Sequence, residues 1–355
     1  METQELMDLA FFEAKQGVDT WTNPQVGAVI VKDGRVLAQG HHERFGGPHA
    51  EINTLNHLEK IADAKGATMY VTLEPCSHFG KTPPCVQKVV EVGIKKVVIG
   101  QKDPNPIVGG NGIKYLLDHD VDVELLNQTG GINQAYNFFY QNKRPLVTLK
   151  YAMTLDGKIN QSKDIRTLIT GEKAYQDSQE LRSHNQAILI GERTLKIDDP
   201  LLTVRSKKMN FPPFRIVVIR DVNTVSPDLK IFQDKFSKIF LLSQTESKQS
   251  FPENVQVEVS DNWTPDNILE FLTKLNIESL LVEGGSQLQA AFVAADRVDQ
   301  VVIYQAPKIF GGQSLPAIRA NYPATEIDFL PPKVTELGPD LKIELRRDDR
   351  VYRNN

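Results

Sequence analysis

The chain has 355 residues, of which 40% are hydrophobic and 24% charged, a balance typical of a globular protein long enough for two domains. Its 41 basic and 45 acidic side chains give a formal net charge of −4, which argues against a large nucleic-acid-binding surface. No apolar run approaches a membrane span or a signal peptide, so we expect no membrane partner.

In the first half of the chain, the sequence pattern predicts alternating helices and strands. Apolar residues at helical spacing predict a helix over 2–16. An Asp33-Gly34 turn joins predicted strands over 26–31 and 35–39. The further predicted elements are a helix opening at Pro48, a strand over 68–73, a helix over 84–92, a strand over 96–99, a helix over 112–118 and a strand over 121–125. This alternation predicts a three-layer α/β domain.

The only two cysteines, Cys76 and Cys85, lie in one short segment downstream of His49-Ala50-Glu51. One histidine and two thiolates make three protein ligands, the number that a catalytic zinc uses because its fourth position stays open for water. Glu51 is free of the metal and could move protons. The alternatives are a disulfide or two buried apolar side chains for the cysteines, and a partner of the helix dipole for Glu51. Cysteines kept as metal ligands suit a reducing cytoplasm.

The surroundings of this cluster favour an anionic substrate. We expect all three ligands near helix N-termini, where the positive end of the helix dipole favours a thiolate. Eight residues separate the cysteines, and this insert contributes cationic donors at the mouth of the pocket. His42 is expected to add another cationic donor, and Asn23 a buried amide. Such groups suit a base that carries a phosphate.

A second domain is predicted from Pro145 onward, which gives domains over 1–144 and 145–355. It should open with a strand over 146–151 and an Asp156-Gly157 turn into a returning strand. The further predicted elements are a helix over 172–184, strands over 187–190, 215–219 and 239–242, a helix over 265–275, a strand over 279–283 and a helix over 286–294. Gly284-Gly285 could bring backbone N–H groups to a phosphate, although no Gly-x-Gly-x-x-Gly fingerprint is present.

The first half resembles the deaminase part of the bifunctional riboflavin-biosynthesis deaminase/reductase family. The motifs that carry the resemblance are Asn23-Pro24-x-Val26-Gly27, Gly40-x-His42, His49-Ala50-Glu51, Glu74-Pro75-Cys76, Thr82-Pro83-Pro84-Cys85 and Asp103-Pro104-Asn105-Pro106. His-x-Glu followed by Pro-Cys is also the signature of zinc deaminases in general. The resemblance implies a cytidine-deaminase-like fold and deamination of 2,5-diamino-6-(5-phosphoribosylamino)pyrimidin-4(3H)-one. It implies zinc at His49, Cys76 and Cys85, Glu51 as proton donor, and substrate contacts at Asn23, His42, His78 and Lys81.

The second half resembles the reductase part of the same family, which is similar in fold to dihydrofolate reductase and uses NADPH. The motifs are Lys150-x-Ala152-x-Thr154-Leu155-Asp156-Gly157-Lys158-Ile159, Asp198-Asp199-Pro200-x-Leu202-Thr203-x-Arg205 and Val282-Glu283-Gly284-Gly285. The implied reaction is reduction of the ribosyl side chain of 5-amino-6-(5-phosphoribosylamino)uracil. The implied cofactor contacts are Met153, Thr194, Asp198, Gly285, Ser286, Gln287, Leu288, Gln289, Ala290 and Ala291. The implied substrate contacts are Arg182, Leu202, Arg205 and Glu283, with both arginines suited to the phosphate.

Two departures from the family leave alternatives open. Leu168 replaces a tryptophan that is common in the family, and the strand after Arg215 ends in Ile219-Arg220-Asp221, where the family usually has Val-Asp. One alternative is therefore a deaminase with a degenerate reductase domain. The other is a nucleic-acid-binding or RNA-editing protein with zinc, which the net charge and the long insert between the cysteines oppose. The resemblance further implies small phosphoribosyl pyrimidines as partners, a homo-oligomer and a cytoplasmic location.

Overall fold

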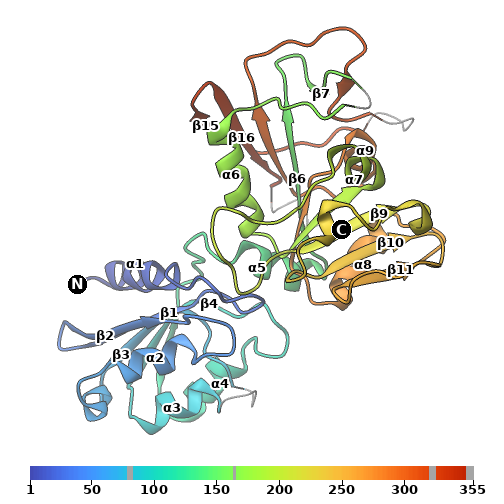
Figure 1. Ribbon diagram of the computed structural model, residues 1–355. Coiled ribbons are helices and arrows are strands. Elements are labelled where there is room, and N and C mark those ends of the chain that lie inside the picture. Colours follow the sequence, from blue (N-terminus) through green and yellow to red (C-terminus); the bar gives the residue numbers. More distant parts are fainter. Residues whose placement is uncertain (78–82, 163–164, 320–324, 349–355) are drawn as a thin grey trace. The chain divides into compact units, whose positions relative to one another are not determined.

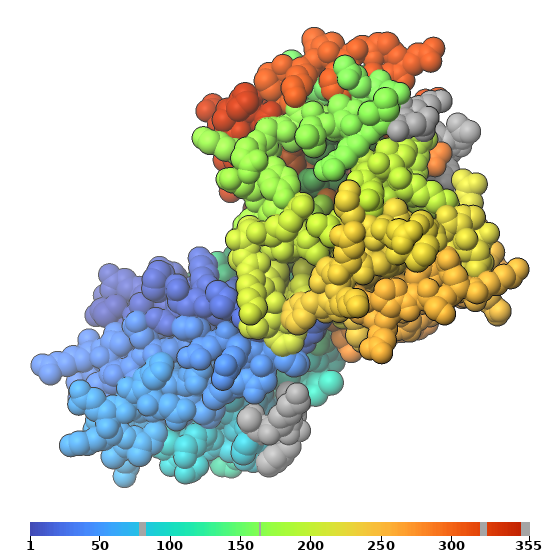
Figure 2. Space-filling model, viewed as in Figure 1, coloured from blue at the N-terminus to red at the C-terminus, as the bar shows by residue number. Residues whose placement is uncertain are grey.

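A computed structural model describes residues 1–77, 83–162, 165–319 and 325–348. The chain divides into two compact units, Met1–Gln141 and Asn142–Asn355. Each unit is built from one continuous stretch of sequence, blue to teal for the first and green to red for the second (Figures 1 and 2). Among the described residues, no helix has both the length and the apolar character needed to cross a membrane.

The first unit is built on a five-stranded sheet in the order β2-β1-β3-β4-β5. Strand β1 is antiparallel to β2 and β3, whereas β3, β4 and β5 are parallel. The elements are α1 (Thr3–Ala14), β1 (Gly27–Lys32), β2 (Arg35–His41), α2 (Ala50–Asn56), a short 3₁₀ helix (Ile61–Ala64), β3 (Thr68–Leu73), α3 (Cys85–Glu91), β4 (Lys96–Gln101), α4 (Asn111–Asp118), β5 (Asp122–Leu125) and α5 (Gln134–Asn142). The predicted hairpin is confirmed: Asp33 and Gly34 have φ of 51° and 74°, as its type I′ turn requires.

Two layers of helices cover the two faces of this sheet (Figure 1). Successive side chains of a strand point to opposite faces, so Val29 and Val31 pack in the cluster with α1. Ala28 and Ile30 pack in the other cluster, with α2, α3 and α4. The predicted three-layer α/β architecture is therefore confirmed.

The second unit is built on a nine-stranded sheet in the order β11-β10-β9-β8-β12-β6-β13-β16-β15. Strands from β11 to β13 are parallel, and β16 and β15 add an antiparallel edge. The strands are β6 (Leu146–Met153), β7 (Lys158–Asn160), β8 (Ala187–Gly191), β9 (Phe214–Ile219), β10 (Ile239–Ser243), β11 (Val255–Val259), β12 (Ser279–Val282), β13 (Gln300–Gln305), β14 (Leu315–Pro316), β15 (Lys333–Leu337) and β16 (Asp340–Arg346). The helices are α6 (Glu172–Ser183), α7 (Glu192–Asp198), α8 (Pro265–Lys274) and α9 (Ser286–Ala294), with short 3₁₀ helices at Val222–Thr224 and Lys230–Phe232.

The predicted Asp156-Gly157 turn is present, but its returning strand does not pair as a hairpin with β6. Gly157 has a φ of 72° and its N–H donates to the Thr154 carbonyl at 3.0 Å. Strand β7 then pairs with β14 rather than β6. The reason is that β6 lies in the sheet interior, hydrogen-bonded to β12 on one side and β13 on the other. No edge of β6 is left for a third strand.

Candidate functional site

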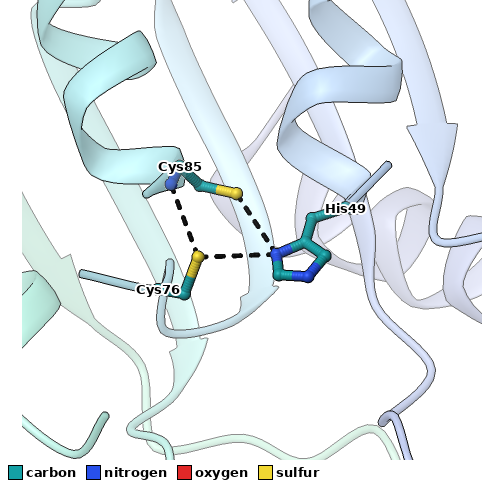
Figure 3. Close-up of side chains that lie close together, drawn as sticks. All are labelled: His49, Cys76 and Cys85. Carbon is teal, nitrogen blue, oxygen red and sulfur yellow. Dashed lines mark hydrogen bonds between the residues drawn. The ribbon is translucent and has the colours of Figure 1, made fainter. Parts of the chain in front are cut away.

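Three side chains that the sequence predicts as metal ligands meet in the first unit (Figure 3). The Nδ1 atom of His49 lies 3.4 Å from the sulfur of Cys76 and 3.4 Å from that of Cys85. The three ligand atoms all lie within 4.8 Å of one another. In the described part of the chain, this is the one group of at least three His, Cys, Asp or Glu side chains that could share a metal ion. Two thiolates and an imidazole are a donor set that zinc prefers.

The ends of two helices and one strand position these ligands. His49 is the residue before α2, in extended conformation with ψ of 163°, so it caps the helix, whereas the predicted helix opening at Pro48 would have placed it in the first turn. Cys85 is the first residue of α3, and Cys76 follows β3. The backbone N–H of Cys85 donates to the Cys76 sulfur at 3.4 Å, so both sulfurs lie at the N-terminus of α3. Exposed N–H groups and the helix dipole favour a thiolate there.

The charges at this cluster are strongly coupled. Hydrogen bonds from the Cys85 thiol and from His49 outweigh burial and lower the pKa of Cys76 to about 4. The interaction with the Cys76 thiolate and burial both raise the pKa of Cys85. One thiolate is thus favoured even without a metal, and a metal that binds both sulfurs displaces the remaining protons.

Glu51 lies in the first turn of α2, two residues after His49, and its side chain is buried with 3% exposure. Burial, followed by the negative charge of Cys76, raises its pKa to about 7. A carboxyl group with such a pKa can both accept and return a proton near neutral pH.

The predicted substrate contacts Asn23 and His42 form a connected pair beside the ligands. The His42 Nδ1 atom donates to the Pro48 carbonyl at 2.9 Å, which leaves Nε2 to accept from the Asn23 amide at 3.1 Å. Burial lowers the pKa of His42, whose ring lies edge-on to that of His49 at 5.7 Å. His42 is therefore a neutral ring that orients Asn23, and the expected cationic donor is not found. His78 and Lys81, also predicted, lie outside the described residues.

Sequence reasoning assigned no role to Glu74, the buried carboxylate next to Pro75-Cys76. Its oxygens accept from the backbone N–H groups of Asp103, Gly110, Gly112 and Ile113, at 2.9–3.2 Å. Glu74 thereby ties the segment that carries Cys76 to the start of α4. The sequence feature that could have indicated this role is the position of a glutamate directly before Pro-Cys.

Gly112 is expected to be essential for this attachment, because a Cβ there would lie 2.1 Å from the Pro75 carbonyl oxygen. In Gly112→Ala the Pro75-Cys76 segment must shift, and we expect a loss of about 1–3 kcal/mol in stability together with reduced zinc content. Metal analysis and thermal unfolding measure both. Gly191→Ala is the control, since a Cβ there meets no atom of the described residues within 4 Å. Full zinc content in Gly112→Ala would contradict this account of the site.

The second unit holds a cavity of about 620 Å³ outside the carboxyl ends of β6, β8 and β12. Ligands of parallel α/β sheets bind at such ends. Eight of the predicted reductase residues line it: Arg182, Thr194, Asp198, Leu202, Arg205, Glu283, Gly285 and Gln289. Six others, all predicted cofactor contacts, are not among its lining residues: Met153, Ser286, Gln287, Leu288, Ala290 and Ala291. Leu168, which replaces the family tryptophan, lines the cavity with 77% of its side chain exposed.

A buried ion pair forms part of the cavity wall. The two carboxylate oxygens of Glu283 accept from Arg182 Nε and Nη2 at 2.7 and 2.8 Å, and Lys150 Nζ lies 3.7 Å away. Burial alone would raise the pKa of Glu283, but the charges of Arg182 and Lys150 lower it to about 2. Lys150 carries part of a sequence motif, yet sequence reasoning gave it no role.

The two arginines predicted to hold a phosphate differ in their surroundings. Arg182 is nearly buried, and besides Glu283 it donates through Nη1 to the Thr203 carbonyl at 3.2 Å. Arg205 is exposed, and among the described residues it has no carboxylate partner. Its guanidinium carbon lies 5.4 Å from the centre of the Tyr175 ring. Arg205 is thus the better placed of the two for an incoming anion.

The start of α9 has the features of a site for a phosphorylated cofactor. Gly284-Gly285 leads from β12 into the helix, and within the described part of the chain no side chain caps its first N–H groups, which can bind an anion. Among the residues that the structure describes, the Ser286 hydroxyl and the Gln289 carbonyl oxygen, both buried there, have no hydrogen-bond partner. Buried polar atoms are normally satisfied, so these orphaned atoms fit a bound polar group such as a dinucleotide.

Comparison with known proteins agrees with these two sites. Residues 1–101 match the cytidine and deoxycytidylate deaminase zinc-binding region, and residues 145–343 match the RibD C-terminal domain. The chain is 35% identical to the riboflavin biosynthesis protein RibD of Aquifex aeolicus, covering 92% of this chain and 93% of that protein. It is 34% identical to the Escherichia coli RibD, covering 97% and 99%. The chain belongs to the RibD family.

Solved structures of RibD proteins have the same overall fold. Acinetobacter baumannii RibD superposes with a TM-score of 0.88 at 30% identity, covering 98% of this chain and 99% of that one. A Thermotoga maritima deaminase/reductase gives a TM-score of 0.85 at 34% identity, covering 97% and 98%. As a RibD protein, the chain is a bifunctional enzyme of riboflavin biosynthesis that joins a zinc-dependent deaminase to an NADPH-dependent reductase. The predicted fold class, function and cofactors are confirmed.

Proposed function

We propose that the His49, Cys76, Cys85 and Glu51 cluster deaminates 2,5-diamino-6-(5-phosphoribosylamino)pyrimidin-4(3H)-one. In the same proposal, the cavity of the second unit reduces the ribosyl side chain of 5-amino-6-(5-phosphoribosylamino)uracil. The Thermotoga maritima relative is described as a diaminohydroxyphosphoribosylaminopyrimidine deaminase/5-amino-6-(5-phosphoribosylamino)uracil reductase, which supports these substrates. The observation that carries the deaminase assignment is a buried carboxyl group, Glu51, beside three convergent zinc ligands.

In the deaminase, His49, Cys76 and Cys85 would hold the metal. Zinc, when bound, supplies the Lewis acid that makes water nucleophilic near neutral pH. Glu51 would take one proton from that water and pass it to a pyrimidine ring nitrogen. It would then carry the second proton, from the hydroxyl group added to the ring, to the departing ammonia as the C–N bond breaks. Asn23, held by His42, would orient a polar edge of the substrate.

In the reductase, NADPH supplies the hydride, and the protein supplies orientation and charge. Thr194 and Asp198 at α7, with the start of α9, would hold the cofactor along one side of the cavity. Glu283 would form the polar wall on which the ribosyl chain is oriented. Arg205 would bind the substrate's phosphate, since its guanidinium is exposed and free of a carboxylate among the residues that the structure describes.

Zinc content tests the ligand assignment. The unmodified protein should hold about one zinc per chain, and Cys85→Ser should lose most of it, because a neutral hydroxyl is a poor substitute for a thiolate ligand. Atomic absorption measures the metal. His57→Ala is the control, since this exposed histidine at the opposite, C-terminal end of α2 is bonded to the Gln39 carbonyl instead. Undiminished zinc in Cys85→Ser would show that the metal binds elsewhere.

Turnover assays separate the bifunctional enzyme from a deaminase with a degenerate reductase. Ammonia release from the diaminopyrimidine reports on the first unit, and NADPH oxidation with the deaminated product reports on the second. We expect both, because the Glu283–Arg182 pair and the cavity are intact despite Leu168. A chain that releases ammonia but leaves NADPH unoxidised would support the degenerate reductase.

We also propose a cytoplasmic location and a homo-oligomeric state. Two free cysteines that must remain thiolates to bind zinc favour a reducing compartment. The oligomeric state rests on the family resemblance, and sedimentation measures it.

A further inference from the structure

The segment Asp199–Arg205 forms one wall of the reductase cavity without regular secondary structure. Asp199 and Leu202 have positive φ angles of 40° and 53°. Such backbone conformations are strained in residues other than glycine, and they persist only when the surrounding structure holds them. The position of Arg205, at the end of this segment, therefore depends on contacts from outside it.

Helix α6 supplies these contacts from one face. Tyr175, Gln179 and Arg182 follow one another at spacings of four and three residues, which places them on the same side of the helix, and all three line the cavity. Arg182 bonds to the Thr203 carbonyl, as described above. The Gln179 side-chain carbonyl accepts from the backbone N–H of Arg205 at 3.0 Å. The Tyr175 ring lies against the Arg205 guanidinium.

Gln179 is the contact that fixes Arg205 itself. It is 3% exposed, and because its partner is an N–H donor, its amide must present the oxygen to Arg205. With the backbone held by Gln179 and the guanidinium by Tyr175, less conformational freedom is left for Arg205 to lose when it binds an anion. Arg182 differs from Arg205, because its guanidinium is already paired with the Glu283 carboxylate.

We propose that Gln179 is a positioning residue, which with Tyr175 holds Arg205 in place for the substrate's phosphate. This rests on the proposed role of Arg205 as the phosphate ligand. Gln179 acts through the Arg205 backbone, so it should affect binding of the phosphorylated substrate and not the hydride transfer that follows.

Gln179→Met keeps the length of the side chain and removes the acceptor. In steady-state NADPH oxidation, KM for the phosphorylated uracil substrate should rise about five- to tenfold with kcat nearly unchanged, as expected for one hydrogen bond in binding. The same substrate without its phosphate should show no change in KM. Gln179→Glu should recover most of the affinity, because a carboxylate oxygen can accept the same N–H. Gln176→Met, at an exposed position of α6, is the matched control.

Ammonia release in each variant reports that the rest of the chain is folded, and Arg205→Ala tests the role on which the proposal depends. If Gln179 acts through Arg205, then Gln179→Met has no further effect on KM in the Arg205→Ala background. An effect that persists there, or that is equal for the unphosphorylated substrate, would overturn the proposal. An unchanged KM in Gln179→Met would also overturn the proposal. In that case the phosphate role of Arg205 still stands if Arg205→Ala raises KM. If Arg205→Ala leaves KM unchanged, both assignments fail.

Discussion

Glu51→Gln should reduce ammonia release by about 10²–10⁴-fold while zinc stays bound, because an amide has the shape of the carboxyl group but cannot carry the proton. Burial places the pKa of Glu51 near 7, which suits a group that must take up and release a proton in one cycle. None of the three ligand atoms belongs to Glu51, so the metal site survives the change. Ammonia release and zinc content in the same preparation measure the two effects separately.

Glu91→Gln is the matched control for this experiment. Glu91 lies on α3, close in sequence to Cys85, but it is 68% exposed and pairs with Lys88 on the surface. Its replacement should leave ammonia release unchanged. NADPH oxidation by the second unit should be normal in both variants. An active Glu51→Gln enzyme would mean that another group carries the proton.

The metal cluster could be predicted from the sequence because its ligands are of rare types in short motifs at the ends of elements. Two cysteines and a His-x-Glu pair leave few combinations that suit zinc. Glu74 and Gly112 could not be found in this way. They lie 38 residues apart, and their roles depend on the packing of α4 against the Pro75 carbonyl. Glutamate and glycine are too common for their types alone to reveal such a contact.

The charge of the site was harder to predict than its composition. His42 was expected to be a cationic donor, as a solvated histidine can be. Burial instead lowers the pKa of His42 and outweighs the hydrogen bond to the Pro48 carbonyl, which raises that pKa, and both are tertiary effects. The reductase arginines show the same limitation. Both were expected to bind a phosphate, but the structure places Arg182 against Glu283, which is 101 residues away in the sequence.

The parallel strands β6, β8, β9, β10 and β12 were predicted well because both of their faces are buried, which makes them short continuous apolar runs. Strand β13 is equally buried between β6 and β16, but it was missed. The sequence analysis predicted no element after Ala294. Strand β15 shows why the edge is difficult: four of its five residues are exposed, and its pairing with β16 is seen only in the folded sheet. Strand β7 was predicted as the returning strand, but its pairing was not, since its partner β14 is 155 residues away.

Glu283→Gln should abolish most of the NADPH oxidation and destabilise the second unit, because the Glu283 carboxylate is the counter-charge of two cationic neighbours. The change leaves Arg182 and Lys150 nearly buried without a counter-charge, and breaking a buried ion pair costs about 3–5 kcal/mol. Because the pKa of Glu283 falls from 4.5 to about 2 on folding, its contribution is complete above pH 4.5 and is lost as the pH falls toward 2. Thermal unfolding at neutral and acid pH measures this contribution.

Glu278→Gln, just before the other end of β12, is the control that isolates the charge. Burial raises the pKa of Glu278 to about 8, so at pH 7 its carboxyl group is already largely protonated, and the amide removes almost no charge. This variant should be at least as stable as the unmodified protein, whereas Glu283→Gln unfolds at a lower temperature. Ammonia release should persist in both variants, because the zinc cluster lies in the other unit. Equal stabilities of the two variants would show that the Glu283 carboxylate does not stabilise its cationic neighbours.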